Sequence, residues 1–194
     1  MNARKFLAAG TVAVLSLFGT AAWAQQSEGG AKPSDPQIVG IVSAANQIDI
    51  DTAKLALKKT KNDQVKQYAQ QMIDDHTKLQ KSVDDLAKKL NVKPESSDTS
   101  KSLHTAAATE MKKLRGMRGK AFDKAYIDRE VDFHQQVIDA ASKVLIPNAQ
   151  NAELKSALEG AAPLLQGHLE RAKQIQSGMG SSSAAGTHKH HKKA

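Results

Sequence analysis

The hydrophobic positions of the chain repeat with the period of an α-helix over most of its length. Apolar residues recur in alternating steps of three and four, the spacing that places them on one stripe of a helix. No stretch alternates apolar and polar residues as a strand would. The pattern predicts long helices over residues 36–60, 62–90, 120–145 and 151–176, and a shorter helix over residues 101–114.

Capping and turn residues mark the expected ends of these helices. Ser34 precedes Pro36, which is the order of an N-cap followed by proline in the first turn. Asn62 is a second N-cap, and Pro147 ends the third long helix. Pro163 falls inside the last helix, where its missing amide hydrogen predicts a kink or a short break.

Amphipathic helices of this length must pack against one another. At 1.5 Å per residue, a helix of about 25 residues is roughly 37 Å long and buries its apolar stripe only against neighbouring helices. We predict an all-α, up-down-up-down four-helix bundle over residues 36–177. The short extra helix is placed between the second and third helices of the bundle.

The segments outside the bundle differ from it in composition. Residues 1–24 read as a secretory signal peptide, because two basic residues precede an apolar run and Ala22-Trp23-Ala24 fits a cleavage site. Residues 25–35 form a polar linker. Residues 178–194 are rich in glycine and serine, then in histidine and lysine, and are predicted to be disordered. The mature chain has no segment long and apolar enough to span a membrane.

Composition and charge narrow the classes of function. The 194-residue chain has no cysteine, which excludes disulfides, thiolate metal sites and a lipid-modified cysteine. Its net charge of +8 is concentrated in the terminal segments, and its aromatic residues fall at core spacing, so binding to nucleic acid is not expected. The basic tail favours a weak association with an anionic envelope surface. The partner is unknown.

Polar residues interrupt the apolar stripes at one level of the predicted bundle. If the helices alternate in direction, these residues lie about 12–18 residues from one shared end, at a depth of roughly 18–27 Å. Imidazole and carboxylate groups are ligands of zinc, iron, manganese and copper. The candidate metal ligands are Asp49, His76, Glu130, His134 and His168.

The same residues have a structural interpretation. Buried histidine and carboxylate groups form hydrogen-bonded pairs that fix which helix faces which. The Glu-x-x-His motif of di-iron bundles is absent, since Ile73, Val131 and Leu165 stand three residues before the histidines. Asp75 should point away from His76 and be exposed. We therefore predict no cofactor, with a transition-metal ion at the five residues as the alternative.

Several stretches of the chain resemble a known bacterial family. They are Asp49 to Ala56, Val65 to His76, Gly119 to Tyr126, His134 and Pro163 to Ala172. On these residues the chain resembles the ferritin-like envelope family catalogued as domain of unknown function 4142. The resemblance implies an exported ferritin-like four-helix bundle, often labelled an outer-membrane protein, and it implies no established activity.

The sequence contains no nucleophile elbow, P-loop or zinc-protease motif, which disfavours an enzyme. We predict an exported periplasmic protein with a structural or interaction role, to which analogy adds a role in envelope stress. Association with the outer membrane is an alternative location. The alternative function is a metal-binding or redox protein that uses the layer of histidines and carboxylates.

Overall fold

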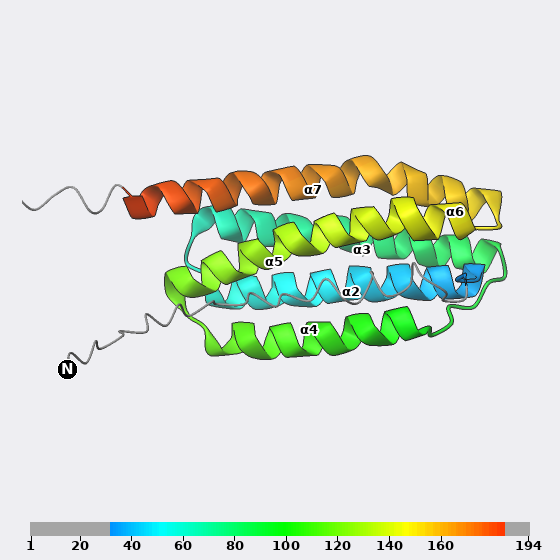
Figure 1. The fold of residues 1–194 in the computed structure, drawn as a ribbon, viewed down its shortest axis with the longest axis horizontal. Coiled ribbons are helices and arrows are strands. Elements are labelled where there is room, and N and C mark those ends of the chain that lie inside the picture. Colours follow the sequence, from blue (N-terminus) through cyan, green and yellow to red (C-terminus); the bar gives the residue numbers. More distant parts are fainter. Residues whose placement is uncertain (1–31, 185–194) are drawn as a thin grey trace, which may run out of the picture.

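A computed structural model describes residues 32–184, and it is helical throughout this range apart from short connections (Figure 1). The signal peptide, residues 25–31 of the linker and residues 185–194 lie outside the described residues. No strand occurs in the described part of the chain. The elements are α2 (Asp35–Lys59), α3 (Asp63–Lys89), α4 (Asp98–Gly116), α5 (Gly119–Ala140), the π-helix η1 (Ala141–Leu145), α6 (Ile146–Asn148) and α7 (Ala152–Ala184).

The first two helices begin directly after the N-cap residues that the sequence predicted. The Ser34 hydroxyl accepts a hydrogen bond from the amide of Gln37, whose side chain accepts one from the Ser34 amide, so the two form a capping box. The Asn62 side chain accepts hydrogen bonds from two amides in the first turn of α3. Ser97 forms a capping box with Ser100 at the start of α4. This helix therefore begins at Asp98 and is longer than predicted.

Two apolar clusters show how the helices run. One contains residues from the end of α2, the start of α3, the start of α5 and the end of α7, among them Ala56, Val65, Phe122 and Ile175. The other joins the opposite ends of the same helices through Ile38, Ala87, Leu145 and Leu154. Therefore α3 and α5 run parallel, while α2 and α7 run antiparallel to both of them.

This direction corrects the alternating topology predicted for the four bundle helices. The extra helix α4 spans 19 residues rather than forming a short insertion, and it returns the chain to the end where α3 begins (Figure 1). A bundle with one long crossover is the ferritin-like arrangement. The all-α, ferritin-like fold is confirmed, and the order of directions among its helices is the part that differs.

The crossover is held against α2 by a close backbone approach. Gly40 of α2 faces the segment before α4, where a Cβ atom at Gly40 would lie only 2.1 Å from the carbonyl oxygen of Glu95. The Glu95 amide donates a hydrogen bond to the carbonyl of Pro36 at 2.9 Å. Only glycine allows the two backbones to come this close.

The third and fourth bundle helices also differ in detail from the prediction. The end of the third helix is not regular α-helix, because Ala141–Leu145 forms a π-helix before Pro147. The last helix continues through Pro163 without a break and extends to Ala184, so the bundle does not end at residue 177. Met179, within the predicted tail, packs against the apolar cluster at that end.

Candidate metal centre

The polar residues predicted for the metal site lie together in the middle of the bundle, between the two apolar clusters. All five are at most 3% exposed, and they come from α2, α3, α5 and α7: Asp49, His76, Glu130, His134 and His168. Each lies near the midpoint of its helix. Reversing the direction of a helix hardly changes the depth of its midpoint, so the layer forms although the predicted directions were wrong.

The three imidazole rings face one another across the bundle axis. The ring centroids of His134 and His168 are 5.3 Å apart, as are those of His76 and His168, while His76 and His134 are separated by 5.7 Å. One nitrogen from each ring lies within 4.8 Å of one nitrogen from each of the others. Three helices therefore present one imidazole nitrogen each to a common point.

The outer nitrogen of each ring lies against a hydrogen-bond acceptor at 3.0 Å. The pairs are His76 Nδ1 with Asn46 Oδ1, His134 Nδ1 with the Glu130 carbonyl oxygen, and His168 Nε2 with Asp75 Oδ2. Because these partners only accept, the outer nitrogen must carry the hydrogen. In a neutral imidazole the inner nitrogen then presents a lone pair.

The inner nitrogens have no hydrogen-bond partner in the described structure. They are His76 Nε2, His134 Nε2 and His168 Nδ1, and all three are fully buried atoms. His76 Nε2 lies 2.9 Å from Asp49 Oδ2, and His134 Nε2 lies 3.4 Å from the same oxygen, without the alignment of a hydrogen bond. Buried polar atoms are normally paired, so this group needs an explanation.

A buried arginine joins the two carboxylates of the layer. Arg129 Nη1 lies 2.9 Å from Asp49 Oδ1 and 2.6 Å from Glu130 Oε1. Although burial alone would raise the pKa of Asp49, His76, His134 and Arg129 hold it well below its usual range. Burial and the neighbouring Asp49 raise the pKa of Glu130 well above its usual range. Asp49 is thus the anionic member of the pair.

Two of the three histidines, His134 and His168, remain neutral at physiological pH. Burial lowers the pKa of His134 to about 4, and burial also lowers the pKa of His168. A neutral imidazole is the form that binds a metal ion. With Asp49 ionised, the arrangement offers three nitrogen donors and one carboxylate oxygen.

Three contributing residues were not singled out by the sequence pattern. Asp75 was expected to be exposed, but its carboxylate accepts a hydrogen bond from His168 across the α3–α7 interface. Burial alone would raise the pKa of Asp75, but the hydrogen bond from His168 holds this pKa below its usual value. Asn46 and Arg129 are buried, whereas Asp75 is partly exposed. Arg129 stands beside Glu130 in the sequence, but only the folded bundle shows which neighbour it faces.

No helix in the described part of the chain is both long enough and apolar enough to cross a membrane.

Two solved structures are similar to this chain in fold. A protein of Streptomyces coelicolor designated DUF305 and described as secreted has a TM-score of 0.63 and 14% identity, with 74% of this chain and 92% of that chain covered. CopM in its Cu(II)-bound form has a TM-score of 0.58 and 19% identity, with 75% and 98% covered. At these identities the likeness shows a shared helical-bundle fold.

The sequence comparisons lead to one family. No curated protein sequence matches the chain. The family model described as Domain of unknown function (DUF4142) matches residues 20–175, most of the chain, so the protein belongs to this family.

Proposed function

We propose that this protein binds one divalent transition-metal ion in the middle of its bundle. The ligands are His76, His134, His168 and Asp49. The observation that carries the proposal is that the inner imidazole nitrogens are buried and lack hydrogen-bond partners, in three rings that each bring one nitrogen within 4.8 Å of a nitrogen of the others. Leaving three lone pairs buried and unpaired is costly, and a bound cation would satisfy all of them.

The donor set indicates the kind of metal. Three imidazoles and one carboxylate suit zinc and copper(II), and the lack of thiolate ligands disfavours copper(I). Among divalent ions of the first transition row, copper(II) generally binds such sites most tightly. CopM, which shares the fold, was solved with Cu(II) bound. We infer that copper(II) has the highest affinity and that zinc also binds.

The second candidate function is a structural role for the same layer. Three contacts already link all four bundle helices: Arg129 with Asp49, His76 with Asn46, and His168 with Asp75. Such a network could specify the packing of the helices without a metal. It does not, however, give partners to the three inner nitrogens. Both candidates are compatible with export to the periplasm, as proposed from the signal peptide.

Thermal unfolding with added metal distinguishes the two functions. The protein should carry His188→Ala, His190→Ala and His191→Ala, so that the tail cannot bind the metal. A ligand present at one hundred times its dissociation constant stabilises the folded state by about 2.7 kcal/mol. We expect copper(II) and zinc to raise the unfolding temperature, and His76→Gln to abolish most of this rise.

The matched control is His104→Gln, which replaces an exposed histidine on α4. It should leave the response to metal intact. If the tail variant shows no metal-linked stabilisation at high metal excess, the metal site is wrong and the structural role stands. If His76→Gln and His104→Gln respond alike, the metal binds elsewhere.

A further inference from the structure

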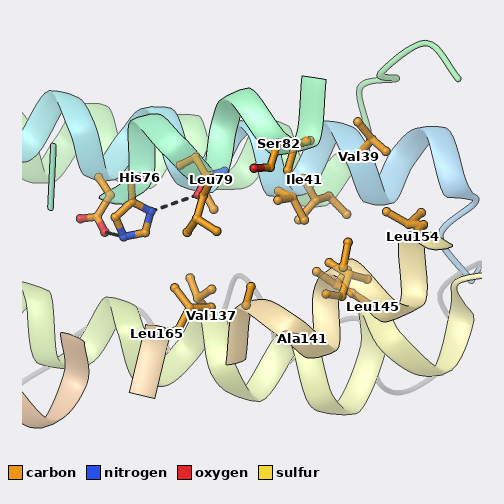
Figure 2. A pocket seen from close by; sticks show the side chains of 18 of the residues that line it. Val39, Ile41, His76, Leu79, Ser82, Val137, Ala141, Leu145, Leu154 and Leu165 are labelled. Carbon is orange, nitrogen blue, oxygen red and sulfur yellow. Dashed lines mark hydrogen bonds and ion pairs between the residues drawn. The ribbon is translucent and has the colours of Figure 1, made fainter. Parts of the chain in front are cut away.

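An apolar cavity lies directly beside the candidate metal centre. It has a volume of about 120 Å³ and runs between the α2–α3 pair and the α5–α7 pair, from the level of His76 towards Leu145 and Leu154 (Figure 2). Apolar cavities of comparable size, about 150 Å³, stay free of water and bind benzene or xenon. The cavity is therefore large enough for a small organic molecule.

The lining of the cavity selects against charged molecules. Its walls are formed mainly by aliphatic side chains, and the polar groups gather at the end where Asn46, Asp49, His76 and His134 lie. Among the described residues, no lysine or arginine lines it. A carboxylate or phosphate would lose its hydration there without meeting a cation, so an anionic ligand is disfavoured.

The cavity has a route to solvent and an unusual wall. Ser82 of α3 and Ala157 of α7 line it and are exposed, which places an opening between these helices. The π-helix Ala141–Leu145 contributes both of its end residues to the opposite wall. A π-helical turn is rare and commonly occurs at functional sites, because the extra residue changes which side chains face inwards.

We propose that this cavity binds a neutral, apolar molecule of about the size of benzene, with one edge against the imidazole layer. The enclosed volume limits the size of the ligand. The aliphatic walls require an apolar surface and disfavour any charged group, which would lose its hydration there. The binding does not depend on a metal ion, because the walls are formed by the protein alone.

The test uses the metal-free mature chain with benzene as the probe, measured by isothermal titration calorimetry, and with xenon, measured by ¹²⁹Xe NMR. We expect saturable binding of benzene at one site. Benzoate has the same ring with a carboxylate and should bind at least about tenfold more weakly, which corresponds to about 1.4 kcal/mol. Because the chain is tested without metal, failure of the metal site would leave this result unaffected.

Two variants test whether the ligand binds in the cavity. Ala161→Leu adds side-chain volume to the wall and should weaken benzene binding about tenfold or more, whereas Ala108→Leu, on the exposed surface of α4, should not. Leu158→Ala enlarges the cavity and should allow the larger naphthalene to bind, which keeps the proposal testable if Ala161→Leu does not fold. Absence of saturable benzene binding, equal binding in Ala161→Leu and Ala108→Leu, or equal affinity for benzoate would each overturn the proposal.

Discussion

At the scale of single residues, the orientation of the histidines depends on their outer partners. A buried neutral histidine carries one hydrogen, and the partner of one nitrogen decides which nitrogen keeps it. Each outer nitrogen donates a hydrogen bond at 3.0 Å. The acceptors are Asn46, the Glu130 carbonyl and Asp75. The inner lone pairs are thus set by residues that do not themselves face the centre.

Asp75 should therefore tune the proposed metal site without binding the metal. In Asp75→Asn, we expect metal affinity to fall about 10- to 100-fold, because the amide orients His168 less strongly and lowers its basicity. Asp74→Asn is the matched control, since Asp74 is the exposed neighbour that pairs with Gln70 instead. Competition titration with a chromophoric chelator measures both affinities. Equal affinities in the two variants would show that Asp75 has no such role.

The lowered pKa of His134 predicts a pH dependence of stability without metal. The folded-state value is about 4 and the ordinary value is 6.5, so the unfolded chain binds more protons between these values. The stabilisation is complete above pH 6.5 and is lost as the pH falls towards about 4. One pKa unit is worth about 1.4 kcal/mol, so the loss attributable to His134 is at most about 3 kcal/mol.

Urea unfolding at several pH values measures this loss, and it should be read as the difference between the wild type and His134→Gln. This comparison matters because Glu130, whose pKa is raised, acts in the opposite direction as the pH rises above its ordinary value. His104→Gln should keep the pH dependence of the wild type, since His104 is exposed. Parallel curves for the wild type and His134→Gln would contradict the burial of a neutral His134.

At the scale of elements, α4 is the helix that decides the topology. It packs against α2 and returns the chain along the whole bundle, so α5 starts at the same end as α3 (Figure 1). The segment before it can approach α2 only because position 40 has no side chain. A contact between two backbones at one glycine thus contributes to holding the crossover.

We expect Gly40→Ala to destabilise the protein by about 1–3 kcal/mol, because its Cβ would overlap the Glu95 carbonyl oxygen and displace the segment before α4. Gly160→Ala is the control: this glycine is also helical, but nothing lies near its Cβ position. It should be neutral or more stable by about 0.5–1 kcal/mol. Denaturant unfolding compares them, and equal stability of the two variants would refute the tight approach at Gly40.

At the scale of the whole molecule, the cavity and the buried charges around the polar centre lower the stability of the bundle. A cavity of about 120 Å³ corresponds to roughly 3 kcal/mol relative to a filled core, at about 24 cal/mol per Å³. The buried charges of Asp49 and Arg129 add a desolvation cost that their mutual contact offsets. The apolar clusters at both ends of the bundle compensate for this middle region.

The end of α7 belongs to one of these clusters. A chain that ends at Ser177 should therefore unfold at a lower temperature than one that ends at Ala184, because it lacks Met179 and the last helical turns. The loss of one partly buried methionine is worth about 1 kcal/mol, or a few degrees in the melting temperature. Differential scanning calorimetry of both chains measures it. Equal melting temperatures would mean that Met179 contributes nothing to the core.

The sequence by itself determined the helices and the composition of the candidate centre. Helix period and N-caps such as Ser34 and Asn62 act over three or four residues, so they can be read locally. The five predicted polar residues were also recognisable, because a buried polar group stands out on an apolar stripe and each lies near the middle of its helix.

Only the tertiary structure decided which helices are neighbours and in which direction they run. Local periodicity is the same for both directions, so it could not show that α3 and α5 are parallel. For the same reason, the contact between Asp75 and His168 and the position of Arg129 between two carboxylates had no local signal. The cavity has none either, since it is a property of the space between helices, which depends on how their side chains meet.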